Sequence, residues 1–281
     1  MNIGIIGYGV IGKATGDTFT SGEVHVYDVR EIDAEENGVV SFSTLKNFLQ
    51  SDIDIIFLCV PSPTVDGKFD SSYITSVLDE IEEIGTTVRP LVLKSTTPPD
   101  IVAELFKCYP DLTIYNPEFL RQRCAVQDLL DMEKHYVYAT SEVDYKAFEQ
   151  YINTSDCNKE IVRFSNVEKL SLLKYASNTY NATRVIFANC IYQMFQDIDE
   201  SGMDYSEFID IFGDFLELNY KRWGHNLQVP GPDGKRGYGG ACLPKDVKAL
   251  VDYTKRINIT ESTMFFSGLE MINHSVRDET Q

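Results

Sequence analysis

Positive charge, paired cysteines and long apolar runs are scarce or missing in this sequence. Its 25 Lys and Arg residues face 43 Asp and Glu residues, so the formal net charge is −18 at pH 7. Such a charge argues against nucleic acid and anionic membrane surfaces as partners. The six cysteines include no CxxC pair, so their spacing indicates neither a zinc site nor a disulfide framework.

No apolar run has the length of a membrane span. The N-terminal segment also lacks the basic region and cleavage site of a signal peptide. These absences predict a cytoplasmic protein that uses no metal.

The first half of the sequence alternates apolar runs with helical patterns. Residues 1–7 form a short apolar run that ends in glycine, as a buried parallel strand does. Gly7, Gly9 and Gly12 then have the G-x-G-x-x-G spacing, which permits a tight turn, backbone approach to a pyrophosphate and close helix packing. We predict an α/β fold in which residues 1–165 form a Rossmann-type doubly wound domain that binds NAD.

The end of the second expected strand, residues 23–28, indicates which dinucleotide binds. Asp28 lies about twenty residues beyond the first glycine, where a carboxylate accepts hydrogen bonds from ribose hydroxyls and repels a 2′-phosphate. This favours NAD over NADP, although Arg30 close by points the other way. Val10 and Ile11, within the glycine segment, are predicted as further cofactor contacts.

Three more apolar runs, 54–60, 90–96 and 113–116, end in polar or turn residues. Ligands of doubly wound sheets bind beyond the carboxyl ends of the strands. We therefore expect site residues after these runs, with Pro61 and Thr96 at the cofactor.

From about residue 166 the pattern becomes that of a long helix, with Asn166 as its N-cap and Gly202 as its stop. The sequence predicts a mostly helical second domain over 166–281. The helix is apolar on more than one face, so residues 166–201 indicate a homodimer interface or an internal core helix. Lys174 and Asn178 lie one turn apart on this helix. A snorkelling lysine and a surface amide are the commoner interpretation, and a cleft-facing pair is the functional one.

Cys242 lies in GYGGACLPKD, residues 237–246. Pro244 suits the first helical turn, so Cys242 is expected at a helix N-terminus, where the dipole and free N–H groups stabilise a thiolate. Free cysteines are usually small buried hydrophobes, as Cys59 and Cys190 within apolar runs are expected to be. The glycines beside Cys242 leave room for a ligand, and we predict that it is a nucleophile.

The sequence resembles the nucleotide-sugar 6-dehydrogenases, the UDP-glucose/GDP-mannose dehydrogenases. The resemblance rests on motifs in order, namely GYGVIG (7–12), VYD (26–28), KSTTPP (94–99), NPEFLR (116–121), KYASNTYNATRVIFAN (174–189) and GYGGACLPKD (237–246). It implies oxidation of a sugar 6-hydroxyl to a uronic acid with two NAD molecules, UDP-glucose to UDP-glucuronate being the first choice.

The resemblance also implies a role for each candidate residue. Cys242 attacks the intermediate aldehyde to give a thiohemiacetal, which is oxidised to a thioester and hydrolysed. Lys174 and Asn178 stabilise the oxyanion. Asp246 positions water with Thr96 close by, and Glu118 is the hydrolytic base. Lys245 lies near the cofactor phosphates, and the sugar site comprises Phe119, Leu120, Arg121, Tyr238, Gly239 and Gly240.

Compared with typical members, the sequence resembles a short form without the C-terminal nucleotide-binding domain. We expect the basic stretch 221–236, with Arg222 and Arg236, to bind the nucleotide instead. Two other functions stay open. One is a two-electron, hydroxyacid-type dehydrogenase that uses Lys174 and leaves Cys242 idle. The other is a non-catalytic nucleotide-binding partner subunit.

Overall fold

The computed structural model describes residues 1–85, 89–196, 202–215 and 228–278. The chain divides into two compact units. The first unit is Met1–Pro63 with Phe69–Lys174, and the second unit is Thr64–Lys68 with Tyr175–Gln281. The division falls within helix α8 (Val167–Gln196). The functional domain boundary at 165/166 stays a prediction. Among the described residues, no helix combines the length and apolarity needed to cross a membrane.

An eight-stranded sheet forms the centre of the first unit, in the order β10-β9-β8-β7-β4-β1-β2-β3. Neighbouring strands pair in parallel, except that β8 and β9 are antiparallel. This confirms the predicted Rossmann-type α/β fold. The strands are β1 (Ile3–Ile6), β2 (Val24–Tyr27), β3 (Val40–Phe42), β4 (Ile55–Leu58), β7 (Leu91–Leu93), β8 (Leu112–Tyr115), β9 (Lys134–Ala139) and β10 (Glu160–Phe164). A separate hairpin joins β5 (Thr64–Val65) to β6 (Lys68–Phe69).

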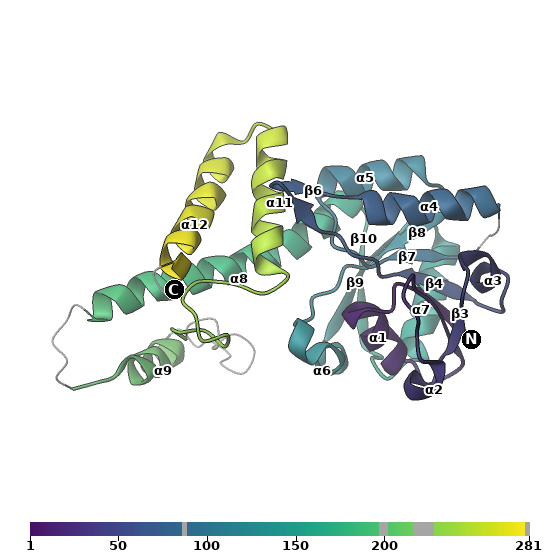
Figure 1. Cartoon of the computed structure of the whole chain (residues 1–281), viewed down its shortest axis with the longest axis horizontal. Helices are drawn as coiled ribbons and strands as arrows, with labels where there is room; N and C mark the ends of the chain where they lie inside the picture. The colour runs from purple at the N-terminus through teal and green to yellow at the C-terminus, as the bar shows by residue number, and fades with distance from the viewer. Residues whose placement is uncertain (86–88, 197–201, 216–227, 279–281) are drawn as a thin grey trace. The chain divides into compact units, whose positions relative to one another are not determined.

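Helices cover both faces of this sheet (Figure 1). Ile5 and Phe57 belong to a cluster on the face covered by α1 (Val10–Asp17), α6 (Ala125–Asp131) and α7 (Glu142–Asn153). Leu58 belongs to a second cluster, with side chains of α3 (Leu45–Leu49), α4 (Ser72–Ile84), α5 (Pro99–Cys108) and the first turns of α8. Because successive strand residues point to opposite faces, a strand buried on both faces is apolar throughout. The short α2 (Ala34–Asn37) and the 3₁₀ turn η1 (Gln122–Cys124) complete this unit.

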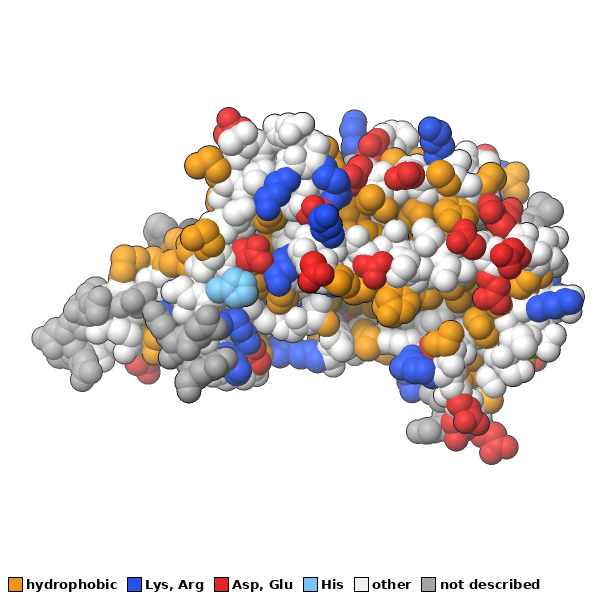
Figure 2. All heavy atoms as spheres, turned by 45° about the horizontal axis from the view of Figure 1, so that its top comes forward, with side chains coloured by type: hydrophobic (Ala, Val, Ile, Leu, Met, Phe, Trp, Pro, Cys, Tyr) orange, Lys and Arg blue, Asp and Glu red, His pale blue; other side chains and the backbone are white. Residues whose placement is uncertain are grey.

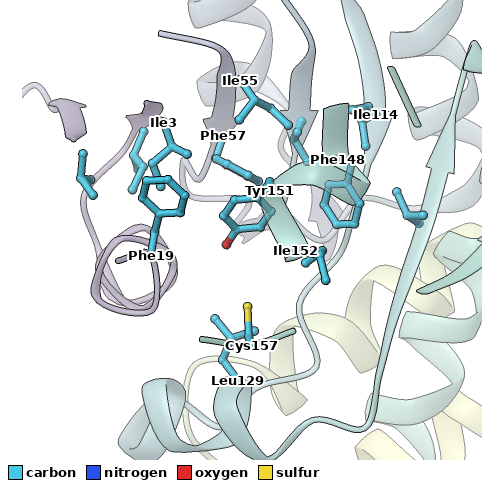
Figure 3. Packing of buried hydrophobic residues seen from close by; sticks show 14 of the residues in the cluster. Ile3, Phe19, Ile55, Phe57, Ile114, Leu129, Phe148, Tyr151, Ile152 and Cys157 are labelled. Atoms are coloured by element: carbon cyan, nitrogen blue, oxygen red, sulfur yellow. The ribbon is translucent and has the colours of Figure 1, made fainter. Parts of the chain in front are cut away.

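Aromatic packing holds α7 on the first of these faces (Figure 3). The ring of Tyr151 is fully enclosed, and its centroid lies 4.6 Å from Phe57, 5.9 Å from Phe148 and 6.0 Å from Phe19. Such pairs add to the hydrophobic contribution of burial. This packing therefore fixes the positions of the strands from which the site loops extend.

The second unit is helical in the described ranges, apart from its short strand segment. It contains most of α8 with α9 (Tyr205–Phe215), α11 (Leu243–Arg256) and α12 (Thr260–Asp278). An apolar cluster joins α8, α11 and α12 through residues such as Ile186, Val247 and Leu269. The Asn166 side chain accepts a hydrogen bond from the Lys169 amide at 2.8 Å, which confirms the predicted N-cap of α8. The last predicted residues of that helix, 197–201, lie outside the described residues.

The acidic composition is visible on the surface of the first unit. Figure 2 shows carboxylate side chains gathered over α4, where four acidic residues are exposed on either side of the buried Ile81, namely Asp79, Glu80, Glu82 and Glu83. A surface of this sign repels anions. An anionic ligand is therefore not expected to bind at the surface over α4.

Candidate active site

The predicted glycine loop joins β1 to α1, and its three glycines meet different surroundings. Gly7 has φ +90, and a Cβ there would lie 2.9 Å from the backbone carbonyl of Cys59. A Cβ at Gly12 would lie 2.2 Å from the Gly7 carbonyl oxygen. A Cβ at Gly9 would meet no atom within 4 Å. Gly7 and Gly12 are thus required for packing, whereas Gly9 faces open space that a ligand can enter.

The start of α1 provides hydrogen-bond donors beside this space. Gly9 caps the helix, and its carbonyl accepts from the Lys13 amide at 2.8 Å. The amides of Val10 and Ile11 belong to the first turn, where N–H groups have no partner within the helix. Free amides and the positive end of the helix dipole suit a phosphate group. The loop therefore fits the pyrophosphate of a dinucleotide.

Asp28 connects the loop to the end of β2. Its Oδ2 accepts from the Tyr8 amide at 2.8 Å, and Arg30 donates from Nε to Oδ1 and from Nη2 to Oδ2, both at 3.0 Å. Burial alone would raise the pKa of Asp28, but the hydrogen bonds from Arg30 and Tyr8 outweigh it and hold this pKa below its usual value. Arg30 is thus paired with the carboxylate predicted to bind the ribose.

Protonation of Asp28 is expected to destabilise the chain at low pH. A carboxyl whose folded-state pKa is lowered contributes stability above its unfolded pKa of about 3.9, and this contribution is lost as pH falls through the folded value. The urea midpoint of the wild-type chain should therefore fall more steeply below about pH 4 than that of Asp28→Asn. Equal slopes for the two proteins would contradict this assignment.

The carboxyl ends of β7 and β8 place an ion pair beside the predicted base. Lys94 and Glu118 are buried, and the Lys94 Nζ is paired with Glu118 Oε1. Lys94 also donates to Asn116 Oδ1 at 2.8 Å, and Asn116 Nδ2 donates to the Tyr136 carbonyl at 2.8 Å. The motif KSTTPP contains Lys94, but the sequence analysis gave it no role. The feature that could have indicated a role for Lys94 is its position directly after an apolar run.

The structure brings Lys174 together with one predicted sugar-binding residue. The Lys174 Nζ lies 5.3 Å from the ring centroid of Phe119, and Lys174 is buried. Leu120 is half-buried, and the exposed Arg121 donates from Nε to Asp128 Oδ2 at 3.0 Å. The sequence analysis missed Asp128. Burial would raise the pKa of Asp128, but its hydrogen bonds with Arg121 lower it.

Two predicted cofactor residues follow neighbouring strands. Pro61 is exposed after β4, and Thr96 is half-buried after β7. A hydrogen bond connects the loop after β4 with the loop after β7, because the Ser95 hydroxyl donates to the Val60 carbonyl at 2.6 Å. Since β4 and β7 are parallel neighbours, these loops lie at the same edge of the sheet.

In the second unit, Cys242 is the N-cap of α11, as predicted. Its carbonyl accepts from the Asp246 amide at 3.0 Å, and its side chain is half-buried. The buried Asp246 carboxylate accepts from the Asn178 amide, and the Lys245 ammonium pairs with Asp246 Oδ1 at 2.7 Å. Four of the predicted residues therefore meet at one helix start. The proposed contact of Lys245 with cofactor phosphates stays a prediction.

Side chains of α8 and α12 hold the glycine loop that precedes Cys242. The Gly237 amide donates to Asn189 Oδ1 at 3.1 Å, and the Tyr238 amide donates to Asn273 Oδ1 at 2.7 Å. Arg277 Nη1 donates to the Gly237 carbonyl at 3.2 Å. None of these three side chains was predicted from the sequence. Asn273 and Arg277 lie one turn apart on α12.

Asn273→Ala is expected to loosen this loop. The substitution leaves the Tyr238 amide buried without its acceptor, at a cost of about 1–3 kcal/mol in the free energy of unfolding. Urea denaturation measures this cost, with His274→Ala as the control because the His274 side chain is 63% exposed. Equal stability of the two variants would show that the loop does not depend on Asn273.

Part of the predicted nucleotide-binding stretch, including Lys221 and Arg222, lies outside the described residues. Arg236 is half-buried, and its guanidinium carbon lies 6.0 Å from the ring centroid of Tyr192. Its contact with a nucleotide stays a prediction.

Two family models match the chain. The NAD binding domain of the UDP-glucose/GDP-mannose dehydrogenase family matches residues 31–150, and the central domain of the same family matches residues 168–275. The chain belongs to the UDP-glucose/GDP-mannose dehydrogenase family. NAD is its cofactor, and the glycine loop, the first turn of α1 and Asp28 are the groups of this structure that fit it.

Individual relatives agree with this family. The UDP-glucose 6-dehydrogenase of Rickettsia typhi is 28% identical over 236 residues, which cover 80% of this chain and 51% of the relative. A UDP-glucose dehydrogenase of the hyperthermophilic archaeon Pyrobaculum islandicum superimposes with a TM-score of 0.77 at 20% identity, covering 98% of this chain and 68% of that chain. The chain spans about half the length of the curated relatives it matches.

The fold alone does not decide the substrate. The 3-hydroxyisobutyrate dehydrogenase of Mycobacterium tuberculosis has a TM-score of 0.73 at 14% identity, covering 98% of this chain and 99% of that chain. Sugar and hydroxyacid dehydrogenases thus share this architecture, and the reaction must be argued from the site.

Proposed function

We propose that the protein oxidises the 6-hydroxyl of a nucleotide sugar to the uronic acid, with UDP-glucose as the first candidate substrate. The observation that carries this proposal is the half-buried Cys242 at the N-terminus of α11, next to the buried contacts of Asp246 with Asn178 and Lys245. The names of the relatives support the substrate class. NAD would accept a hydride in each of the two oxidations.

Cys242 makes the second oxidation feasible. An aldehyde has no hydride to give until a nucleophile or water has added to its carbonyl carbon. Attack by the thiolate Sγ on that carbon gives the oxyanion of a thiohemiacetal, and loss of a hydride from this oxyanion leaves a thioester. A bound sugar aldehyde is thereby retained until it is fully oxidised.

Lys174 and Asn178 are proposed to stabilise the oxygen anion that forms when the thiol adds. Lys174 is buried and carries the positive charge, and Asn178 supplies an amide already oriented by Asp246. Oriented donors stabilise developing charge best where water is excluded. Asp246 is also proposed to position water for the last step, and Thr96 to assist it.

The final step is hydrolysis of the thioester, for which Glu118 is the proposed base. It takes a proton from water as the water oxygen bonds to the acyl carbon. The carbon–sulfur bond breaks, and Cys242 leaves as the thiolate. Phe119, Leu120, Arg121 and the loop at Tyr238, Gly239 and Gly240 are proposed to hold the sugar.

A homodimer through α8 is also proposed. Large hydrophobic side chains of this helix are exposed in the chain, including Tyr180 at 60% and Met194 at 55%. Burial of such side chains against a second copy would remove apolar area from water.

The substrate class is tested by incubating the protein and NAD with UDP-glucose, GDP-mannose or 3-hydroxyisobutyrate. NADH is followed by absorbance, and the products are identified by mass spectrometry. We expect a uronic acid from a nucleotide sugar and no turnover of the hydroxy acid. Turnover of 3-hydroxyisobutyrate alone would instead assign the chain to the two-electron dehydrogenases.

A further inference from the structure

Lys94, which forms an ion pair with Glu118, has no assigned role in the steps above. The side chains of the pair are only 3% and 7% exposed, although each carries a charge that water would solvate well. Charges are rarely buried unless they are paired, because desolvation is costly. The pair lies at the edge of the sheet where the site residues gather, since Lys94 follows β7 and Glu118 follows β8.

Four titratable side chains interact with the charges of the pair, and burial favours the neutral form of each. Cys59 follows β4, His135 lies on β9, Tyr151 on α7 and Cys157 after α7. Burial raises the pKa of Cys59 to about 12, and it also raises the pKa values of Tyr151 and Cys157. Burial lowers the pKa of His135. Within this cluster, the charge of Glu118 is therefore balanced by Lys94.

Lys94 is itself held in place. The Lys94 ammonium donates a hydrogen bond to Asn116 Oδ1 at 2.8 Å. The Asn116 side chain is held in turn because its Nδ2 donates to the Tyr136 carbonyl of β9. The Lys94 ammonium also lies 5.6 Å from the ring centroid of Phe57 on β4. The side chains of Asn116 and Phe57, with the Tyr136 carbonyl behind Asn116, thus determine where the ammonium lies. The ion pair joins Lys94 Nζ to Glu118 Oε1.

We infer that Lys94 is a positioning residue for thioester hydrolysis, because it holds the Glu118 carboxylate in the orientation needed to take a proton from the attacking water. This inference rests on the proposed function, in which Glu118 is the hydrolytic base. Lys94 does not act on the sugar or on Cys242. Its loss should therefore slow hydrolysis and leave the oxidation that precedes it intact.

The test compares Lys94→Gln with the wild-type chain in single turnovers with UDP-glucose and excess NAD. NADH formation reports the oxidations, and intact-mass spectrometry reports the acyl group on Cys242. In Lys94→Gln we expect NADH formation within about threefold of wild type and hydrolysis slowed about 100-fold or more, the scale of general-base catalysis. The acyl-enzyme should then accumulate.

Three further variants separate positioning from a purely structural role. Lys94→Arg keeps the charge and should restore hydrolysis to within about tenfold of wild type. Asn116→Ala keeps both charges but removes the lysine's anchor, and should slow hydrolysis selectively by about tenfold. If Lys94→Gln does not fold, Asn116→Ala is used in its place to test the inference. Lys134→Gln should behave as wild type, because Lys134 and Glu160 form an exposed pair, with side chains 44% and 61% exposed.

The outcomes distinguish this inference from the proposed function. If the wild-type chain turns over and the variants slow NADH formation and hydrolysis alike, or accumulate no acyl-enzyme, Lys94 has only a structural role. If the wild-type chain forms no NADH with any nucleotide sugar, the proposed function fails, and the role of Lys94 fails with it.

Discussion

Cys242→Ala is expected to lower the rate of uronic acid formation at least about 1,000-fold, because a thiol nucleophile has no substitute at this position. Without the thiohemiacetal, the reaction stops at the aldehyde. Cys190→Ala is the matched control, since it removes a thiol of α8 that is exposed and has no proposed role. The burial expected for Cys190 from its apolar run was wrong, because this position lies on an exposed face of the helix. Mass spectrometry of the product, with a hydroxylamine trap for the aldehyde, measures the effect.

The fate of the aldehyde makes this prediction specific. Trapped aldehyde in Cys242→Ala, with none in Cys190→Ala, is the expected pattern. Acid formation at the wild-type rate in Cys242→Ala would show that the thiol takes no part in the second oxidation.

Alanine substitutions at Gly9 and Gly12 are expected to separate cofactor binding from stability. At Gly12, the new methyl group would lie 2.2 Å from a backbone oxygen, so Gly12→Ala should lower the free energy of unfolding by at least ~2 kcal/mol. At Gly9 the backbone is extended, with φ −85, and the methyl group meets no protein atom within 4 Å. Gly9→Ala should fold normally but weaken NAD binding about tenfold or more, because the methyl group occupies the pyrophosphate's space.

Urea denaturation and NAD titration of both variants measure these effects. Each variant is the control for the other, since the two glycines lie three residues apart and the substitutions add the same group. Normal NAD affinity in Gly9→Ala would mean that the dinucleotide does not approach the loop at this residue.

The buried strands could be predicted because they are apolar throughout. The run 54–60 contains β4, 90–96 contains β7 and 113–116 overlaps β8, each with polar residues where the strand ends. The sequence analysis identified neither β3 nor β9. β3 has three residues and a largely exposed pattern, and β9 alternates buried and half-buried side chains that include a lysine and a histidine. Short or mixed strands of this kind resemble loops in a sequence.

The site was predictable where one short segment carries the chemistry. The glycine loop and the Cys242 helix start are such segments, and both lie at helix N-termini as expected. The supporting contacts join distant parts of the chain. Lys94 meets Asn116 across 22 positions, and the Tyr238 amide meets Asn273 across 35. Such pairs follow from strand order and helix packing, which no local spacing reveals.

The number of NADH molecules formed per sugar consumed tests the account most directly. The wild-type chain is allowed to oxidise limiting UDP-glucose to completion with excess NAD. We predict two NADH and one uronic acid per sugar, because the Cys242 thioester requires both oxidations. One NADH per sugar, with the aldehyde as final product, would contradict the four-electron mechanism.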